Sequence, residues 1–177
     1  MQNSELIKRC LSGSKRHQRL LYDNYYDLAF NKAYRYLNDR QEAEDAVVIA
    51  YNEVFRNLFK FRLHNEDSLK NWILTIVTNA ALKILRSKIR FTVELEVVED
   101  LAESEMETED NSETIRQIHQ IVKTMPDGYR IVFVMYVLEG YMHKEIAEFL
   151  NITVNTSKSQ LSKAKTHIRT KLKVNKV

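Results

Sequence analysis

The chain has 177 residues, 44% of them hydrophobic, which is enough for packed cores in one domain or two small ones. Three Gly and one Pro are too few for a sandwich or barrel built on tight turns, and the single Cys10 excludes a disulfide framework or a thiolate metal cluster. No apolar run approaches the roughly 18 residues of a spanning helix, and the first residues contain no signal-peptide core. We therefore expect an all-α protein of the cytoplasm, without membrane insertion.

The net charge of +3 hides a strong asymmetry. Residues 92–113 hold ten acids and no Lys or Arg, so the rest of the chain carries 27 basic and 14 acidic residues, a net charge of +13. Like charges and few aromatic residues predict that this acidic stretch is a flexible linker, extended or loosely helical, between two folding units. The basic remainder favours a polyphosphate partner, although a solvated surface also explains scattered charge.

Up to residue 90, apolar residues recur at helical spacing, with breaks at residues 12–14, 38–39 and 61–67. This pattern predicts a short first helix and three longer ones over about 17–37, 41–59 and 68–86. Ser68 is the expected N-cap of the last helix. The stripe expected to be buried on the helix 17–37 includes Leu20, Leu21, Leu28 and Ala29.

A second helical unit is expected from about residue 113. Residues 115–125 predict a helix that ends at Pro126, and residues 127–138 predict another that Gly140 stops in left-handed geometry. The stretch KEIAEFLNITVNTSKSQLSKAK, residues 144–165, then indicates two helices around a left-handed turn at Asn151, with Thr153 capping the second. The apolar stripe expected on that second helix consists of Val154, Leu161, Ala164, Ile168 and Leu172.

These features predict a helix-turn-helix that binds DNA. Residues 154–177 contain seven Lys or Arg and no acid. Gln and Asn side chains read base edges in the major groove, while Lys, Ser and Thr contact phosphates. A solvated amphipathic helix is the alternative, but the turn, the cap and the short polar side chains together favour DNA binding. The residues expected to face DNA are Asn155, Thr156, Lys158, Ser159, Gln160, Ser162, Lys163 and Lys165.

Three segments of the chain carry a family pattern: MPDGYRIVFVMYVLEGY through KEIAEFLNITVNTSKSQLSKAK within residues 125–172, YRYLNDRQEAEDAVVIAYNEVF (34–55) and NWILTIVTNAALKILR (71–86). With these segments the chain resembles the extracytoplasmic-function (ECF) sigma factors of bacterial RNA polymerase. The first segment is similar to region 4 of that family, and the other two are similar to region 2. The resemblance implies a region 2 domain over 1–91, a linker over 92–113 and a region 4 domain over 114–177. It also implies a factor that directs core RNA polymerase to promoters and helps to melt the DNA.

The family's division of labour implies roles for individual residues. Region 4 holds the minus-35 element through its helix-turn-helix. In region 2, the third helix docks on a coiled coil of the largest polymerase subunit, and the fourth helix with its preceding loop meets the minus-10 element. The implied polymerase contacts are Glu44, Asp45, Val48 and Ile49, the last two standing where the family usually has Gln-Glu. The implied minus-10 contacts are Lys60, Phe61, Arg62, Asn79, Lys83, Arg86, Lys88 and Arg90.

Other functions have less support in the sequence. The five His residues lack metal-ligand spacing and no Gly-rich phosphate loop is present, so we expect neither an enzyme nor a cofactor. One alternative is a helix-turn-helix regulator whose first 90 residues form a sensor or dimerisation domain. A membrane-surface or purely structural bundle is another. The resemblance implies core polymerase and promoter DNA as partners, an anti-sigma factor as a further partner, and a free protein that is monomeric.

Overall fold

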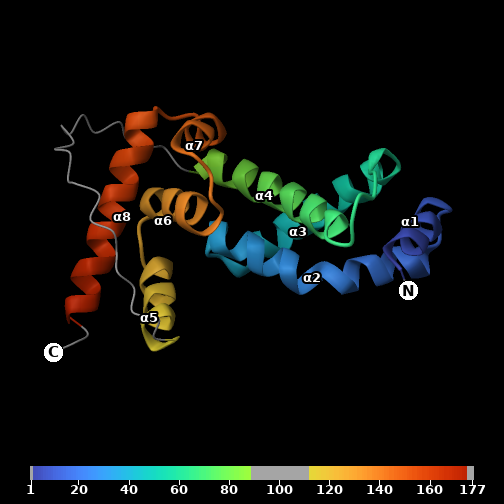
Figure 1. The fold of residues 1–177 in the computed structure, drawn as a ribbon, viewed down its shortest axis with the longest axis horizontal. Coiled ribbons are helices and arrows are strands. Elements are labelled where there is room, and N and C mark those ends of the chain that lie inside the picture. The colour runs from blue at the N-terminus through green and yellow to red at the C-terminus, as the bar shows by residue number, and fades with distance from the viewer. Residues whose placement is uncertain (1, 89–111, 175–177) are drawn as a thin grey trace. The chain divides into compact units, whose positions relative to one another are not determined.

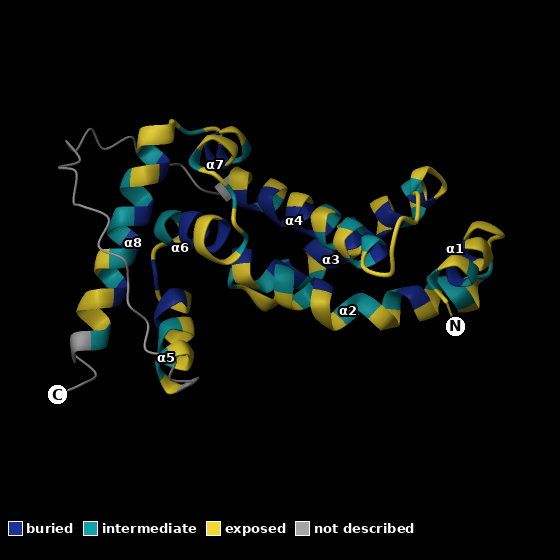
Figure 2. Ribbon diagram, viewed as in Figure 1, coloured by how far each residue is buried: buried dark blue, intermediate teal, exposed yellow. Residues whose placement is uncertain are grey.

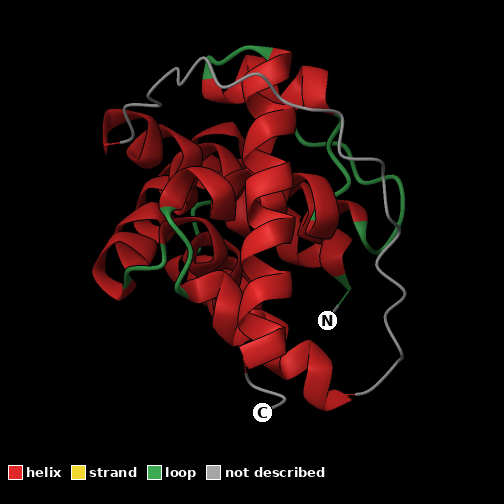
Figure 3. Cartoon of the chain, turned by 90° about the vertical axis from the view of Figure 1, so that its left-hand side faces the viewer, coloured by secondary structure: helices red, strands yellow, loops and turns green. Residues whose placement is uncertain are grey.

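The computed structural model describes residues 2–88 and 112–174. Within these ranges all regular structure is helical, which confirms the predicted all-α class (Figure 3). The chain divides into two compact units, Met1–Lys88 and Ile89–Val177. Most of the predicted acidic linker lies outside the described residues, but its last two residues, Ser112 and Glu113, already belong to a helix of the second unit.

The first unit is built from four helices and one short helical turn (Figure 1). These elements are α1 (Asn3–Leu11), α2 (Lys15–Leu37), α3 (Arg40–Asn57), the 3-10 turn η1 (Leu58–Lys60) and α4 (Ser68–Lys88). The predicted break between α2 and α3 is confirmed. Asn38 adopts the left-handed conformation with φ 52°, and the carboxylate of Asp39 caps α3 by accepting a hydrogen bond from the Glu42 N–H at 2.9 Å.

The core of this unit lies where α2, α3 and α4 pack against one another (Figure 2). Ala29, Ala46 and Ala50 are fully buried, so the helix backbones approach closely at these positions. The predictions for Leu20 and Leu28 are wrong, because these side chains are 40% and 47% exposed. The buried stripe of α2 instead contains the next residue in each case, and successive residues of a helix point in directions that differ by about 100°.

One buried tyrosine ties two of these helices together. Tyr51 of α3 is buried, and its hydroxyl donates a hydrogen bond to the carbonyl oxygen of Tyr22 on α2 at 3.3 Å. The two rings also pack together, with centroids 4.6 Å apart. Burial raises the pKa of the Tyr51 phenol, so it remains a hydrogen-bond donor throughout the physiological pH range.

The second unit contains α5 (Ser112–Lys123), α6 (Asp127–Phe133), η2 (Val134–Leu138), α7 (His143–Leu150) and α8 (Val154–Val174). The turn η2 is π-helical and continues α6, and Gly140 follows it with φ 75°, as predicted. Helix α8 packs against α5, α6 and α7 (Figure 1). Ile131, Met135, Ile146 and Ile168 form the centre of this core.

The described residues were also compared with what a membrane-spanning helix and a metal site require. No helix among them combines the length and the apolar character that a membrane crossing requires. The same part of the chain holds no group of three His, Cys, Asp or Glu side chains arranged to bind a metal ion.

Candidate nucleic-acid interface

Helices α7 and α8 form the predicted helix-turn-helix. Asn151 ends α7 in the left-handed conformation with φ 54°. The Thr153 hydroxyl accepts a hydrogen bond from the Thr156 N–H at 3.0 Å and so caps α8. At the start of α7, Met142 has no capping hydroxyl, but its N–H donates to the Glu145 carboxylate at 2.8 Å. Both helix starts are therefore fixed by local hydrogen bonds.

The outer face of α8 carries most of the predicted DNA contacts. Asn155 and Lys158 are exposed. The other predicted contacts are partly exposed, although the Gln160 Oε1 atom is enclosed and has no hydrogen-bond partner in the structure. The partly exposed residues are Thr156, Ser159, Gln160, Ser162, Lys163 and Lys165.

The inner face of α8 differs from the prediction at its first turn. Val154, which was expected to be buried, is 39% exposed, while Ser157 is completely buried. The Ser157 hydroxyl lies 2.9 Å from Nδ1 of His143, the first residue of α7. Sequence reasoning missed both residues. The available signal was a serine at the place where the spacing of Leu161 and Ala164 requires an inward side chain.

In the first unit, the predicted minus-10 contacts begin in η1 and the loop that follows it. The Phe61 ring packs on Trp72 of α4, with ring centroids 5.0 Å apart, so both rings are partly buried. Phe59 is instead 60% exposed, and the Lys60 ammonium lies 5.4 Å from its ring centroid. Arg62 is exposed beside them. Phe59 is thus the aromatic ring of this loop that is open to a partner.

Ser68 gives this loop a defined shape, although it is not the N-cap that the sequence predicted. It is the first residue of α4, and the Asp67 carbonyl accepts the N–H of Asn71 at 3.0 Å, so Asp67 takes the cap position. The Ser68 hydroxyl accepts the N–H groups of His64 and Asn65 at 3.2 and 3.3 Å. It also donates to the Asn65 carbonyl at 2.6 Å, which closes the loop locally.

Three further predicted minus-10 residues share one face of α4. Asn79, Lys83 and Arg86 are all exposed and are separated by four and three residues, which brings their side chains to the same side of the helix. Lys88 is the last residue of α4, and only its backbone is described. Arg90 lies outside the described residues.

The predicted polymerase contacts also share a face, on α3. Asp45 is exposed, and Glu44 is partly buried and pairs with Arg40 at 3.0 Å. Val48 and Ile49 are 55% and 46% exposed. Two exposed β-branched side chains beside two acids form a mixed apolar and acidic surface, which is typical of a protein contact.

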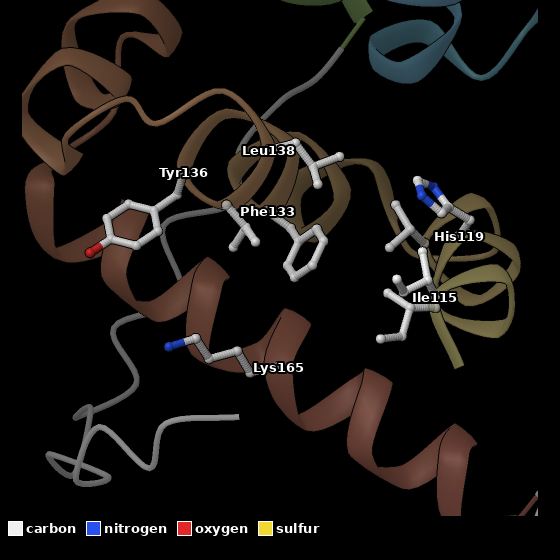
Figure 4. Close-up of a pocket in the computed structure, with 9 residues that line it drawn as sticks. Ile115, His119, Phe133, Tyr136, Leu138 and Lys165 are labelled. Carbon is white, nitrogen blue, oxygen red and sulfur yellow. The ribbon is translucent and has the colours of Figure 1, made fainter. Parts of the chain in front are cut away.

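The second unit also carries an apolar groove, which the sequence analysis did not predict (Figure 4). Its volume is about 540 Å³, and it is bounded by α5, α6, η2 and α8. Ile115, Val137 and Leu138 are large apolar side chains that remain exposed there. Lys165 of α8, one of the predicted DNA contacts, also lines this groove (Figure 4). The lining residues are Ile115, Ile118, His119, Val122, Phe133, Tyr136, Val137, Leu138 and Lys165.

Both units match models of known protein families. Residues 21–91 match "Sigma-70 region 2", and residues 115–168 match "Sigma-70, region 4". The chain is 28% identical to the ECF RNA polymerase sigma factor SigW of Bacillus subtilis, over 94% of this chain and 95% of the relative. It is 24% identical to the RNA polymerase sigma-H factor of Pseudomonas aeruginosa, over 93% and 90% of the two chains. It is 25% identical to the ECF RNA polymerase sigma-E factor of Escherichia coli K12, over 94% and 92%.

A helix-turn-helix unit and a second helical unit, each matching a different sigma region, define a transcription initiation factor. These matches do not favour a regulator with a sensor domain. The chain belongs to the ECF sigma factors, and it directs RNA polymerase to promoters.

Proposed function

We propose that this sigma factor reads the minus-35 element with the outer face of α8. The observation that carries this proposal is the capped helix-turn-helix, whose second helix shows Asn155 and Lys158 to solvent and has no acid from Val154 to Val174. Asn reads base edges, while Lys and the short hydroxyl side chains contact phosphates. The net positive charge of this face, which has basic residues and no acid in the described part of the helix, favours DNA over a neutral surface.

For the minus-10 element, we propose the loop after α3 together with the face of α4 that carries Asn79, Lys83 and Arg86. A protein that opens DNA without fuel has to trap unstacked bases and phosphates. The exposed Phe59 ring offers a stacking surface, and Lys60 and Arg62 add positive charge beside it. The Ser68 hydrogen bonds shape this loop, which lowers the conformational cost of binding a splayed base.

Core polymerase, in this proposal, binds the face of α3 formed by Glu44, Asp45, Val48 and Ile49. The exposed apolar pair supplies area for burial, and Asp45 supplies a charge for a basic residue of the partner. The factor acts without catalytic chemistry of its own and is monomeric when free. Its two units are held at the distance between the minus-35 and minus-10 elements when polymerase binds both of them.

Run-off transcription on genomic fragments tests the whole proposal. With core polymerase and the purified chain together, we expect transcripts with discrete 5′ ends, and mapping these ends identifies the promoters. Core polymerase alone is the control. Absence of discrete 5′ ends above this control, with an active polymerase preparation, would contradict the proposed function.

An anti-sigma factor is proposed to restrain the protein by covering the apolar groove. The support is the exposed apolar surface of Ile115, Val137 and Leu138, which a helix with an apolar ridge would bury. Leu138→Asp is therefore expected to raise expression of a promoter reporter several-fold in uninduced cells, because a buried charge weakens the contact. Leu11→Asp is the matched control, since Leu11 is also exposed but lies on α1. Unchanged or lower reporter expression at equal protein level would contradict this role.

A further inference from the structure

Ser157 is a polar residue on the buried side of α8, the helix proposed to read the minus-35 element. It has no exposed surface, although Asn155 and Lys158 beside it are open to solvent. Its hydroxyl lies 2.9 Å from the Nδ1 atom of His143. A buried hydroxyl is favourable only when it is hydrogen-bonded, so this contact ties the start of α8 to the start of α7.

The first turn of α8 depends on this contact more than the rest of the helix does. The buried apolar side chains of the described part of α8 are Leu161, Ala164 and Ile168, and all of them follow Ser157. Val154 is 39% exposed and so anchors the first turn weakly. The Thr153 cap satisfies a backbone N–H of α8 itself, so it is a contact within the turn. The bond between Ser157 and His143 is a buried side-chain contact that holds the first turn of α8 against the start of α7.

His143 is itself held in place from a third element. Its ring stacks on that of Tyr136 in η2, with centroids 4.4 Å apart and an angle of 22° between the planes. The stack fixes the plane of the imidazole, and the bond to Ser157 fixes the direction of Nδ1. Elements η2, α7 and α8 therefore meet at this one side chain.

We propose that His143 is a positioning residue for promoter reading, which acts through Ser157 on the exposed residues of the first turns of α8. This inference rests on the proposed reading of the minus-35 element by α8. Contacts to base edges require a defined side-chain direction, whereas phosphate contacts tolerate a small rotation of the helix. Loss of the bond therefore lowers the discrimination between correct and altered minus-35 sequences more than it lowers total transcription.

Four variants of the full chain separate the hydrogen bond from simple packing. His143→Phe keeps a ring for Tyr136 and removes the nitrogen. Ser157→Ala removes the hydroxyl, and the double variant removes both partners, so that neither is left unpaired. His143→Asn is the matched control, because its amide places a hydrogen-bonding group near the position of Nδ1.

The measurement is the ratio of run-off transcripts from a mapped promoter and from the same promoter with single-base changes in its minus-35 element. We expect His143→Phe and Ser157→Ala each to lower this ratio roughly threefold to tenfold, the double variant to lose no more than one single variant, and His143→Asn to keep most of the ratio. Circular dichroism of each variant monitors folding, and a general loss of fold reduces both transcripts together.

Two results would overturn the inference. One is an unchanged ratio in both single variants, and the other is an equal loss in His143→Asn and His143→Phe. Failure of the proposed function is distinct, since the wild-type chain would then give no promoter-directed transcript. In that case amide hydrogen exchange tests whether the bond between His143 and Ser157 holds the start of α8. The bond predicts faster exchange there in Ser157→Ala and not in His143→Asn.

Discussion

Lys158→Glu is expected to lower promoter-directed transcription about tenfold or more, with no change in the binding of core polymerase. Lys158 is exposed on the reading face of α8, where the described residues carry no acid. The substitution removes one phosphate contact and places a negative charge against the DNA backbone. Run-off transcription measures the first quantity, and retention of tagged protein with core polymerase measures the second.

Lys8→Glu is the matched control for this experiment. Lys8 is exposed on α1, outside every proposed interface, so the same charge reversal there should change transcription little. Equal transcription by Lys158→Glu and the wild-type chain would remove α8 from the minus-35 assignment. A parallel loss of polymerase binding would show instead that the substitution acts on another step.

Asp45→Arg is expected to weaken the binding of core polymerase about tenfold or more without unfolding the first unit. Asp45 is exposed, and its replacement leaves the core of α2, α3 and α4 intact. Val48→Ala in the same assay removes part of the apolar contact without adding a polar group, and it is expected to weaken binding because Val48 is 55% exposed and its burial by a partner is the expected source of affinity. Titration of labelled protein with core polymerase gives both affinities.

Asp27→Arg is the matched control for that titration. Asp27 is exposed on α2, so it provides the same charge change outside the proposed α3 surface. The α3 assignment fails when Asp45→Arg binds as tightly as Asp27→Arg does. Cooperative thermal unfolding of all three variants at the wild-type temperature excludes loss of fold as the cause.

Local signals in the sequence were sufficient for most of the fold. The left-handed residues Asn38, Asn151 and Gly140 end helices where the sequence predicted breaks, because their conformations are local properties of the chain. The predictions that failed concern the rotation of a helix. Leu28 and Val154 lie at the edge of a buried stripe, and the packing of neighbouring helices decides which edge is covered.

The candidate sites also divide into those that the sequence could predict and those that depend on packing between helices. The contacts on α8 were predicted from residue types and helical spacing, whereas those on α3 and α4 were implied by the family resemblance, and helical spacing then puts Asn79 and Lys83 on one exposed face. The groove and the pair of His143 with Ser157 require contacts between elements that are distant in the chain, which spacing alone does not provide. The signal for this pair in the sequence was a serine, buried in the structure, at an inward position of an otherwise apolar stripe.

Tyr136 belongs to two of the features described above. It lines the apolar groove (Figure 4), and its ring also supports His143, which holds the reading helix. A protein that moves the Tyr136 ring when it binds in the groove thereby changes the energy of the stack between Tyr136 and His143. By thermodynamic linkage, DNA bound to α8 would then change the affinity of the groove for that protein by the same factor.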